Sequence, residues 1–295
     1  MRFKIKIPAT TANIGAGFDS VGIALNLYLI LDVTPSVTWK FVANSAELNG
    51  VPSDKSNLIY LIAEQVARKY GHAGLPACRV EMTSEIPLAR GLGSSSTAVV
   101  AGIELADQLL NLQLSKQEKA VIATEIEGHP DNVAPAIFGG CVIGHAGDSF
   151  EYVQVPITSD LTFVTMIPDY ELKTADARAV LPEAYSRIET IKGSSIANVS
   201  VAALFKRDWA LLGKMMEMDV FHQPFRRALV PEYEQMKKFI SEFVYGTYLS
   251  GAGPTMISLA ADEVKMKIPE WEKAVPHIKW QLLKADNTGT QVIRE

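Results

Sequence analysis

The chain reads Pro87-Leu88-Ala89-Arg90-Gly91-Leu92-Gly93-Ser94-Ser95-Ser96-Thr97 in a stretch rich in glycine and serine, which we call the glycine-serine loop. Before the loop, residues 79–83 alternate polar and apolar side chains, which predicts a half-buried strand. After it, residues 98–110 place apolar side chains at helical spacing. Free backbone N–H groups at the start of a helix, where the helix dipole is positive, bind anions. The loop is therefore predicted to hold a phosphate group.

The two commonest phosphate-binding loops do not fit this stretch. A Walker A loop needs a lysine followed by serine or threonine after its second glycine, whereas Gly93 is followed by serines. A Rossmann fingerprint needs a third glycine, where this chain has Ser96, and an acidic residue after a second strand. An ordinary strand-to-helix turn with serine caps is the alternative. The run of three serines and a threonine favours phosphate binding.

Composition and charge exclude several classes of protein. The 295 residues suffice for one large or two moderate domains, and a content of 48% hydrophobic and 21% charged residues is typical of soluble globular proteins. The net charge of −5, without a long basic run, argues against a nucleic-acid partner. No apolar stretch reaches the roughly 18–20 residues of a membrane helix, so no membrane partner is expected. Cys78 and Cys141 are too few for a disulfide framework or a zinc site, so we expect a reduced, cytoplasmic setting.

The pattern of elements divides the chain into two predicted domains, residues 1–153 and residues 154–295. In the first, strands are expected at 2–7, 23–33, 38–43 and 78–83, and helices at 56–70, 98–110 and 115–127. In the second, a strand is expected at 161–167, helices at 176–180, 188–205, 209–218 and 231–243, and a strand–glycine turn–strand unit at 248–257. This order predicts an α+β second domain.

A tight loop follows the first predicted strand. Residues 10–19, Thr-Thr-Ala-Asn-Ile-Gly-Ala-Gly-Phe-Asp, are small, contain two glycines, and can present Asn13 and Asp19 to a ligand. The alternative is a surface turn in which Asp19 caps local backbone groups.

A second polar cluster ends a predicted helix. Glu127 offers a hard oxygen ligand for Mg²⁺ beside a loop serine, as nucleotide chemistry requires. His129, Asp131 and Asn132 are candidates for the hydrogen bond to an accepting hydroxyl. Glu125 is the alternative metal ligand, although helical spacing puts it on a different face. The alternative for the whole cluster is a polar turn that only ends the helix.

Arginines form the third cluster. Thr174 is expected to cap a helix that carries Arg178, and Arg226 follows a proline in a connection between helices. Guanidinium groups bind carboxylates and phosphates with paired hydrogen bonds. Arginines without such a role are nevertheless common on protein surfaces.

These pieces together resemble the GHMP small-molecule kinases. The motifs are Pro-x-x-x-Gly-Leu-Gly-Ser-Ser from residue 87, Thr-Ala-Asn-x-Gly-x-Gly-Phe-Asp at 11–19, Glu-Gly-His-Pro-Asp-Asn-Val-Ala-Pro at 127–135 and Ser-Gly-Ala-Gly-Pro at 250–254. Residues 129–135, with Thr-x-x-Ala-Arg-x-Val-Leu-Pro at 174–182, are most similar to the homoserine kinase branch. The resemblance implies the α+β, two-domain GHMP kinase fold. Its N-terminal domain is a ribosomal-protein-S5-like α/β domain that binds ATP, and its C-terminal domain is a ferredoxin-like α+β domain.

The resemblance also implies an activity and a set of site residues. Homoserine kinases use ATP to phosphorylate the side-chain hydroxyl of L-homoserine to O-phospho-L-homoserine, on the route to threonine. The glycine-serine loop would wrap the ATP phosphates, and Glu127 with Ser95, or its neighbour Ser94, would hold Mg²⁺. The expected substrate-binding residues are Asn13, Asp19, His129, Thr174, Arg178, Arg226 and Gly251. Asn132 would contact the reacting hydroxyl. Because members of the family are often dimeric, we also expect a homodimer.

Two questions stay open at this stage. Asp131 is either a general base, as described for mevalonate kinase, or a structural and electrostatic group; we favour the second, with Asn132 orienting the hydroxyl. The rival functions are a mevalonate-type kinase of the same fold and a non-catalytic sensor of nucleotide and a small ligand.

Overall fold

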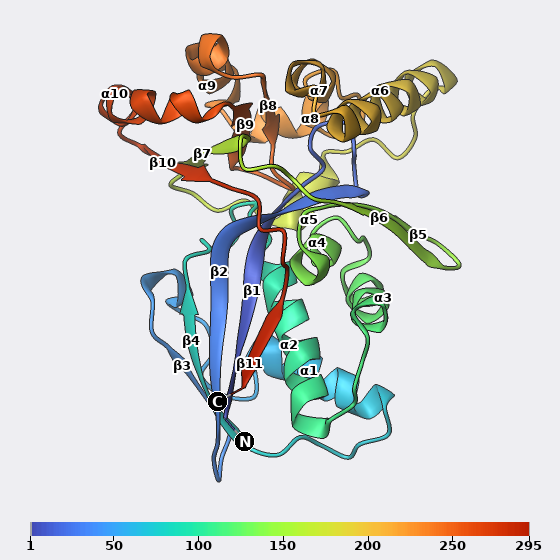
Figure 1. Ribbon diagram of the computed structural model, residues 1–295, viewed down its shortest axis with the longest axis vertical. Coiled ribbons are helices and arrows are strands. Elements are labelled where there is room, and N and C mark those ends of the chain that lie inside the picture. Colours follow the sequence, from blue (N-terminus) through green and yellow to red (C-terminus); the bar gives the residue numbers. More distant parts are fainter. Residues whose placement is uncertain (1, 295) are drawn as a thin grey trace.

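Two antiparallel-rich sheets organise the molecule, whose computed structural model describes residues 2–294 (Figure 1). The first sheet has seven strands, in the order β11-β1-β2-β4-β3, with β5 paired to the other end of β2 and β6 paired to β5. Its strands are β1 (Phe3–Ala12), β2 (Val21–Pro35), β3 (Lys40–Ala43), β4 (Cys78–Ser84), β5 (Cys141–Ala146), β6 (Phe150–Val155) and β11 (Gln291–Arg294). The second sheet, in the order β10-β7-β9-β8, consists of β7 (Thr162–Pro168), β8 (Gly246–Leu249), β9 (Met256–Ala260) and β10 (Ile278–Leu283).

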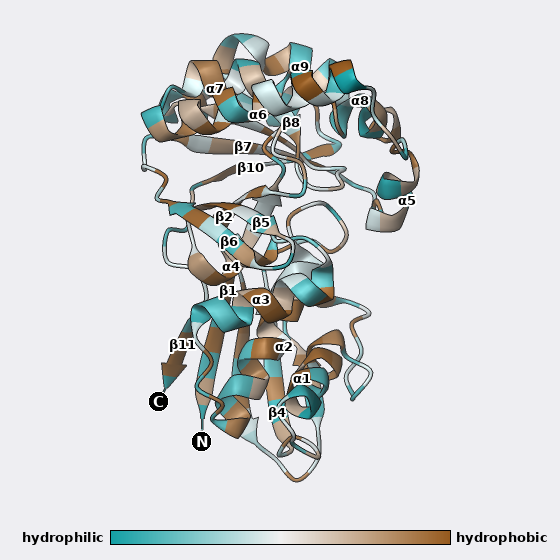
Figure 2. Cartoon of the chain, turned by 90° about the vertical axis from the view of Figure 1, so that its right-hand side faces the viewer, coloured by the Kyte–Doolittle hydropathy of each residue, from teal (hydrophilic) through white to brown (hydrophobic). Residues whose placement is uncertain are grey.

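Each sheet is covered by its own helices. On the first sheet, α2 and α4 contact the strands while α1 and α3 pack against α2 (Figure 1). These helices are α1 (Leu58–Lys69), α2 (Ser94–Leu110), α3 (Lys116–Glu127) and α4 (Val133–Phe138). We call the first sheet with its helices the first unit, and the second sheet with its helices the second unit. The second sheet lies between the first unit and its own layer of helices (Figure 2). The helices of this half are α5 (Thr174–Ala179), α6 (Arg187–Lys206), α7 (Trp209–Met216), α8 (Gln223–Arg226), α9 (Tyr233–Ile240) and α10 (Ile268–Ala274).

The main core lies between the first sheet and α2 and continues to residues of the second sheet, among them Phe163 and Tyr248. β1 alternates in its first half, so that Phe3, Ile5 and Ile7 are fully buried. α2 is buried on most of its surface because it touches the sheet on one side and α1 and α3 on others. Two sheets with their own helices agree with the predicted α+β fold class. The division at residues 153 and 154 stays a prediction, and a single cut there would separate β11 from its partner β1.

Several local predictions can be compared with the structure. The helix predicted at 115–127 is α3, which begins after a capping box at Ser115. The helix predicted from 56 starts at Leu58 and is capped by Asn57, whose side chain accepts a hydrogen bond from Ile59 N–H. Lys173, and not Thr174, is the N-cap residue of α5, so the predicted threonine cap is wrong. The helix predicted from 231 starts at Tyr233, and β6, α8, α10, β10 and β11 were not predicted at all. No helix within residues 2–294 is both long and apolar enough to cross a membrane.

Candidate active site

A cleft of about 490 Å³ brings together the three clusters singled out in the sequence. Its walls come from the first unit and from α5, α8 and the turn between β8 and β9. Every predicted catalytic and substrate-binding residue lines it: Asn13, Asp19, Glu127, His129, Asp131, Asn132, Thr174, Arg178, Arg226 and Gly251. The loop contributes Leu88, Ala89, Gly91, Gly93, Ser94, Ser95, Ser96 and Thr97.

The glycine-serine loop turns sharply into α2. Gly93 is the N-cap residue with φ 71°, and a side chain there would collide with Thr10 Oγ1, 2.1 Å from the ideal Cβ position. Only glycine allows this close approach at a positive φ. Helix geometry leaves the N–H groups of the first turn of α2 without intrahelical partners, which is the anion-binding feature that the sequence predicted.

Three residues of the loop are absent from the cleft wall. The Arg90 guanidinium donates to the carbonyls of Leu88 and Pro168 and lies 3.8 Å from the Asp169 carboxylate. Leu92 is fully buried, and Pro87 lines a different hollow. Arg90 therefore ties the loop to the second unit, and a role for these three residues in nucleotide binding stays a prediction.

The carboxylate of Glu127 meets the loop at one serine. Ser96 Oγ donates to Glu127 Oε1 at 2.9 Å, whereas Ser95, the serine predicted to share the metal, is exposed at the cleft. The alternative ligand Glu125 points elsewhere, because its carboxylate pairs with Lys69 at 2.6 Å. The two hard oxygens of Glu127 and Ser96 thus form the pair that a divalent cation could use.

His129, Asp131 and Asn132 form one hydrogen-bonded unit. His129 Nδ1 lies 2.5 Å from Asp131 Oδ1, and Asn132 Nδ2 donates to the same oxygen at 3.3 Å. Thr10 Oγ1 donates to Asn132 Oδ1 at 2.8 Å, a contact that the sequence gave no reason to expect. Burial by itself lowers the pKa of the His129 imidazole, but its hydrogen bond and charge interaction with Asp131 outweigh burial, so the pKa is raised above the ordinary value.

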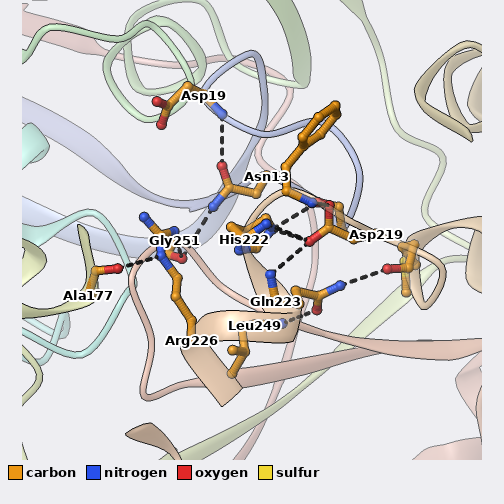
Figure 3. Close-up of polar contacts among 12 residues, drawn as sticks. Asn13, Asp19, Ala177, Asp219, His222, Gln223, Arg226, Leu249 and Gly251 are labelled. Carbon is orange, nitrogen blue, oxygen red and sulfur yellow. Dashed lines mark hydrogen bonds and ion pairs between the residues drawn. The ribbon is translucent and has the colours of Figure 1, made fainter. Parts of the chain in front are cut away.

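Oppositely charged groups gather at the other side of the cleft. The Arg178 guanidinium donates to both carboxylate oxygens of Asp19, at 2.8 and 3.2 Å. Asn13 Oδ1 accepts from the Asp19 backbone N–H, and Asn13 Nδ2 donates to the Gly251 carbonyl at 3.2 Å (Figure 3). Arg226 donates to the same carbonyl at 3.0 Å. Burial, and next the nearby charge of Arg178, lower the pKa of the Arg226 guanidinium.

The comparisons with known proteins agree with this geometry. The family models for the GHMP kinases N terminal domain and the GHMP kinases C terminal region match residues 57–140 and 200–270. A homoserine kinase of Halalkalibacterium halodurans is 46% identical over 99% of this chain and 95% of its own length. A homoserine kinase of Bacillus licheniformis is 44% identical over 100% of this chain and 97% of its own length. The chain belongs to the homoserine kinase branch of the GHMP kinases.

A solved structure extends the likeness of this GHMP kinase to the fold as a whole. The homoserine kinase from Cytophaga hutchinsonii has a TM-score of 0.84 and 27% identity, and the match covers 99% of this chain and 97% of that one. The family resemblance noted in the sequence is therefore confirmed.

One arm of the cleft in this GHMP kinase was missed at the sequence level. It is apolar and is lined by Leu48, Val51, Pro52, Leu58, Ile59, Met82 and Ile86. The buried Asn57 joins two of the segments that line it, because its side chain donates to the Pro52 carbonyl at 2.8 Å while capping α1. These residues come from four separate segments and form no motif, so only the folded chain brings them together.

Proposed function

We propose that this chain transfers the γ-phosphoryl group of ATP to the side-chain hydroxyl of L-homoserine, giving O-phospho-L-homoserine. The observation that carries the proposal is a single cleft with an anion-binding loop at one side and paired Asp19, Arg178 and Arg226 at the other. Relatives at 42–48% identity that bear the name homoserine kinase support the same reaction.

The nucleotide would occupy the loop and the apolar arm. The first-turn N–H groups of α2 and the hydroxyls of Ser94 to Thr97 would receive the phosphates. The arm lined by Leu48, Val51 and Met82 suits a flat base of low polarity. Glu127, with the hydroxyl of Ser96 or Ser95, would hold Mg²⁺, and these hard oxygens fit that ion. When bound, Mg²⁺ neutralises negative charge on the phosphates.

The amino acid would bind as a zwitterion between Asp19 and the arginines. The Asp19 carboxylate suits the substrate ammonium, and the guanidinium groups of Arg178 and Arg226 suit its carboxylate. Without substrate, Asp19 and Arg178 bind one another, so both groups stay hydrogen-bonded until a zwitterion replaces their contact. Asn13, Thr174 and Gly251 complete the wall around this end.

Asn132 would orient the hydroxyl that attacks phosphorus. Its neighbour Asp131 already accepts from His129 and from the Asn132 amide, so we assign Asp131 an electrostatic role rather than that of a general base. Phosphoryl transfer through a loose transition state needs little proton removal before attack, and positioning with charge neutralisation can carry most of the acceleration.

The two rival functions have less support. Mevalonate has no ammonium group, so it would leave the Asp19 carboxylate without its partner cation. A sensor without turnover has no use for the Glu127–Ser96 contact or for an oriented Asn132. A mevalonate-type kinase is therefore not favoured, and neither is a sensor.

The test is coupled release of ADP with ATP and Mg²⁺, offering L-homoserine, D-homoserine, L-serine, mevalonate and galactose separately. We expect saturable turnover with L-homoserine alone. As a control, Glu127→Gln should lower kcat by about a hundredfold or more, because it removes charge compensation in the transition state. Turnover of mevalonate in preference to L-homoserine, or none with any acceptor, would refute the proposed substrate.

We also propose a homodimer in the cytoplasm. Several apolar side chains of α6 are exposed, among them Ile188, Ile191 and Phe205, and a partner subunit would cover such a face.

The cysteines support the cytoplasmic location, because Cys78 and Cys141 are buried and unpaired. Burial raises the pKa of the Cys141 thiol to about 12. Light scattering of the purified protein tests the dimer, and fractionation of cells tests the location.

A further inference from the structure

α8 is too short to be stable by itself, yet it delivers Arg226 to the cleft. The helix has four residues, whereas isolated helices need roughly 12–15 residues to be even marginally stable in water. Arg226 is 2% exposed. Its Nε donates to the Ala177 carbonyl at 3.1 Å and its Nη1 to the Gly251 carbonyl at 3.0 Å. Contacts outside the helix must therefore set the position of this guanidinium.

Asp219 supplies the first of these contacts. Its buried carboxylate accepts from three backbone N–H groups at the start of α8: Phe221 at 2.8 Å, His222 at 3.1 Å and Gln223 at 2.8 Å (Figure 3). Oδ1 serves Phe221, and Oδ2 serves the other two. Both carboxylate oxygens are used, so an amide of the same shape cannot satisfy all three donors.

Gln223 supplies the second contact by joining α8 to two other elements. Its Nε2 donates to the carbonyl of Met216 at the end of α7, at 2.8 Å. Its Oε1 accepts from the backbone N–H of Leu249, the last residue of β8, at 2.9 Å. The chain passes from Leu249 through Ser250 to Gly251, whose carbonyl receives Arg226. Gln223 thus fixes α8 relative to the same turn that Arg226 contacts.

His222 links α8 to the loop that carries Asn13 and Asp19. The fully buried His222 donates from Nε2 to the Gly15 carbonyl at 2.8 Å, because a carbonyl can only accept. Its ring stacks on Phe18 at 5.3 Å, and the Arg226 guanidinium lies 5.1 Å from the centre of the same Phe18 ring. Burial lowers the pKa of His222, which is consistent with a neutral imidazole.

We propose that Asp219 and Gln223 are positioning residues for the amino-acid substrate, acting through Arg226. Neither lines the cleft, and both hold α8 against elements that end at the substrate side. This inference rests on the proposed function, because it assigns Arg226 to the substrate carboxylate. No hydrogen bond within residues 2–294 joins α8 to the glycine-serine loop, so ATP binding should depend much less on either residue than L-homoserine binding does.

The test is steady-state kinetics of Asp219→Asn in the full chain. We expect KM for L-homoserine to rise about tenfold or more while KM for ATP stays within about twofold, as for a lost ground-state contact to one substrate. Asp208→Asn is the matched control: Asp208 caps the neighbouring α7 through Leu211 N–H, it is exposed, and it does not line the cleft. Both variants should lower Tm, but Asp208→Asn should leave both KM values unchanged.

A double variant separates positioning from general destabilisation. Arg226→Gln alone should strongly weaken the binding of L-homoserine. Adding Asp219→Asn should then change kcat/KM for L-homoserine by no more than about twofold. The amino alcohol 2-amino-1,4-butanediol lacks the carboxylate, so KM for this compound should hardly change in Asp219→Asn. If Asp219→Asn does not fold, Gln223→Met can replace it. Methionine has a shape similar to that of glutamine but cannot bond to Met216 or Leu249, so KM for L-homoserine should again rise while KM for ATP does not.

Two results would overturn the positioning role. One is an equal rise of KM for ATP and for L-homoserine in Asp219→Asn or Gln223→Met. The other is a full effect of Asp219→Asn in the Arg226→Gln background. Failure of the unaltered protein to phosphorylate L-homoserine is a different result, because it rejects the proposed function itself.

Discussion

At the scale of single residues, the orientation of one amide limits the chemistry of the cleft. Asn132 Oδ1 accepts from Thr10 Oγ1, and Asn132 Nδ2 donates to Asp131 Oδ1. The Asp131 carboxylate can only accept, so it decides which end of the amide carries the N–H groups, and the Thr10 hydroxyl is free to donate to the other end. Asn132 therefore turns its N–H groups toward Asp131 and the cleft, and it can donate to a substrate oxygen but cannot take a proton from it.

Thr10→Val tests the importance of that orientation. Valine keeps the shape of Thr10 against Gly93 but removes the hydroxyl, so the Asn132 amide is held only by its contact with Asp131. We expect kcat to fall about tenfold to a hundredfold, since small misplacements of a reacting group have effects of this size. KM for ATP should not change, and Thr10→Ser should restore most of kcat. Normal kcat in Thr10→Val would show that Asn132 needs no such support.

Asp131→Asn should reverse the pKa shift of His129. With the carboxylate removed, burial remains and lowers the pKa of His129 below its ordinary value of about 6.5. In the native protein, protonated His129 stabilises the folded state. This contribution is complete at pH values below the pKa of His129 in the unfolded chain, and it is lost as the pH rises through the pKa in the folded protein. In Asp131→Asn the sign is opposite, so stability should fall as pH drops below about 6.5. NMR titration of His129 and unfolding at several pH values measure both effects.

The same variant decides between the two roles of Asp131. A general base contributes about a hundredfold or more, so its loss would lower kcat by that factor. We expect a drop in kcat of less than about tenfold, well below the effect of Glu127→Gln. A loss as large as that of Glu127→Gln would establish Asp131 as the base.

At the scale of elements, the sequence predicted what is local and missed what is not. The capping box of α3, the strand and helix on either side of the glycine-serine loop, and the turn between β8 and β9 follow from residues close in the chain. β6 was missed because only Phe150 among its six side chains is buried and the alternation breaks at Val153 and Gln154. α8 was missed because four residues carry no helical period.

The site shows the same limit. The motifs predicted the charged residues of the cleft except Lys173, yet the supports of these residues lie far away in the chain: Thr10 is 122 residues from Asn132, and His222 is 207 from Gly15. Gly22 is another such support. A side chain there would lie 1.6 Å from the Asp131 carbonyl, so β2 and the turn before α4 touch directly. No pattern of spacing in the sequence reports a contact of this kind.

At the scale of the whole molecule, the chain returns to its first unit after building the second. Asp286 is buried and accepts from Tyr28 Oη, Thr288 N–H and Gly289 N–H, and its own backbone bonds to Ala24 and Gly140. The Asn287 side chain pairs with both backbone groups of Ile157, at 2.9 and 2.8 Å. β11 then covers the edge of β1. The first unit is therefore made of two stretches of chain whose ends meet at residues 157 and 287.

This arrangement predicts how the first unit behaves alone. Residues 1–157, joined by a short glycine-serine linker to residues 284–295, should unfold in one cooperative transition. Residues 1–157 without that segment should be less stable by about 3 kcal/mol or more, because several hydrogen bonds worth about 1 kcal/mol each are lost and the edge of β1 is exposed. Urea unfolding followed by circular dichroism measures the difference. The control is the linked protein with Asn287→Ala, which should recover most but not all of the stability. Equal stability with and without residues 284–295 would mean that the first unit ends near residue 153, as a single cut requires.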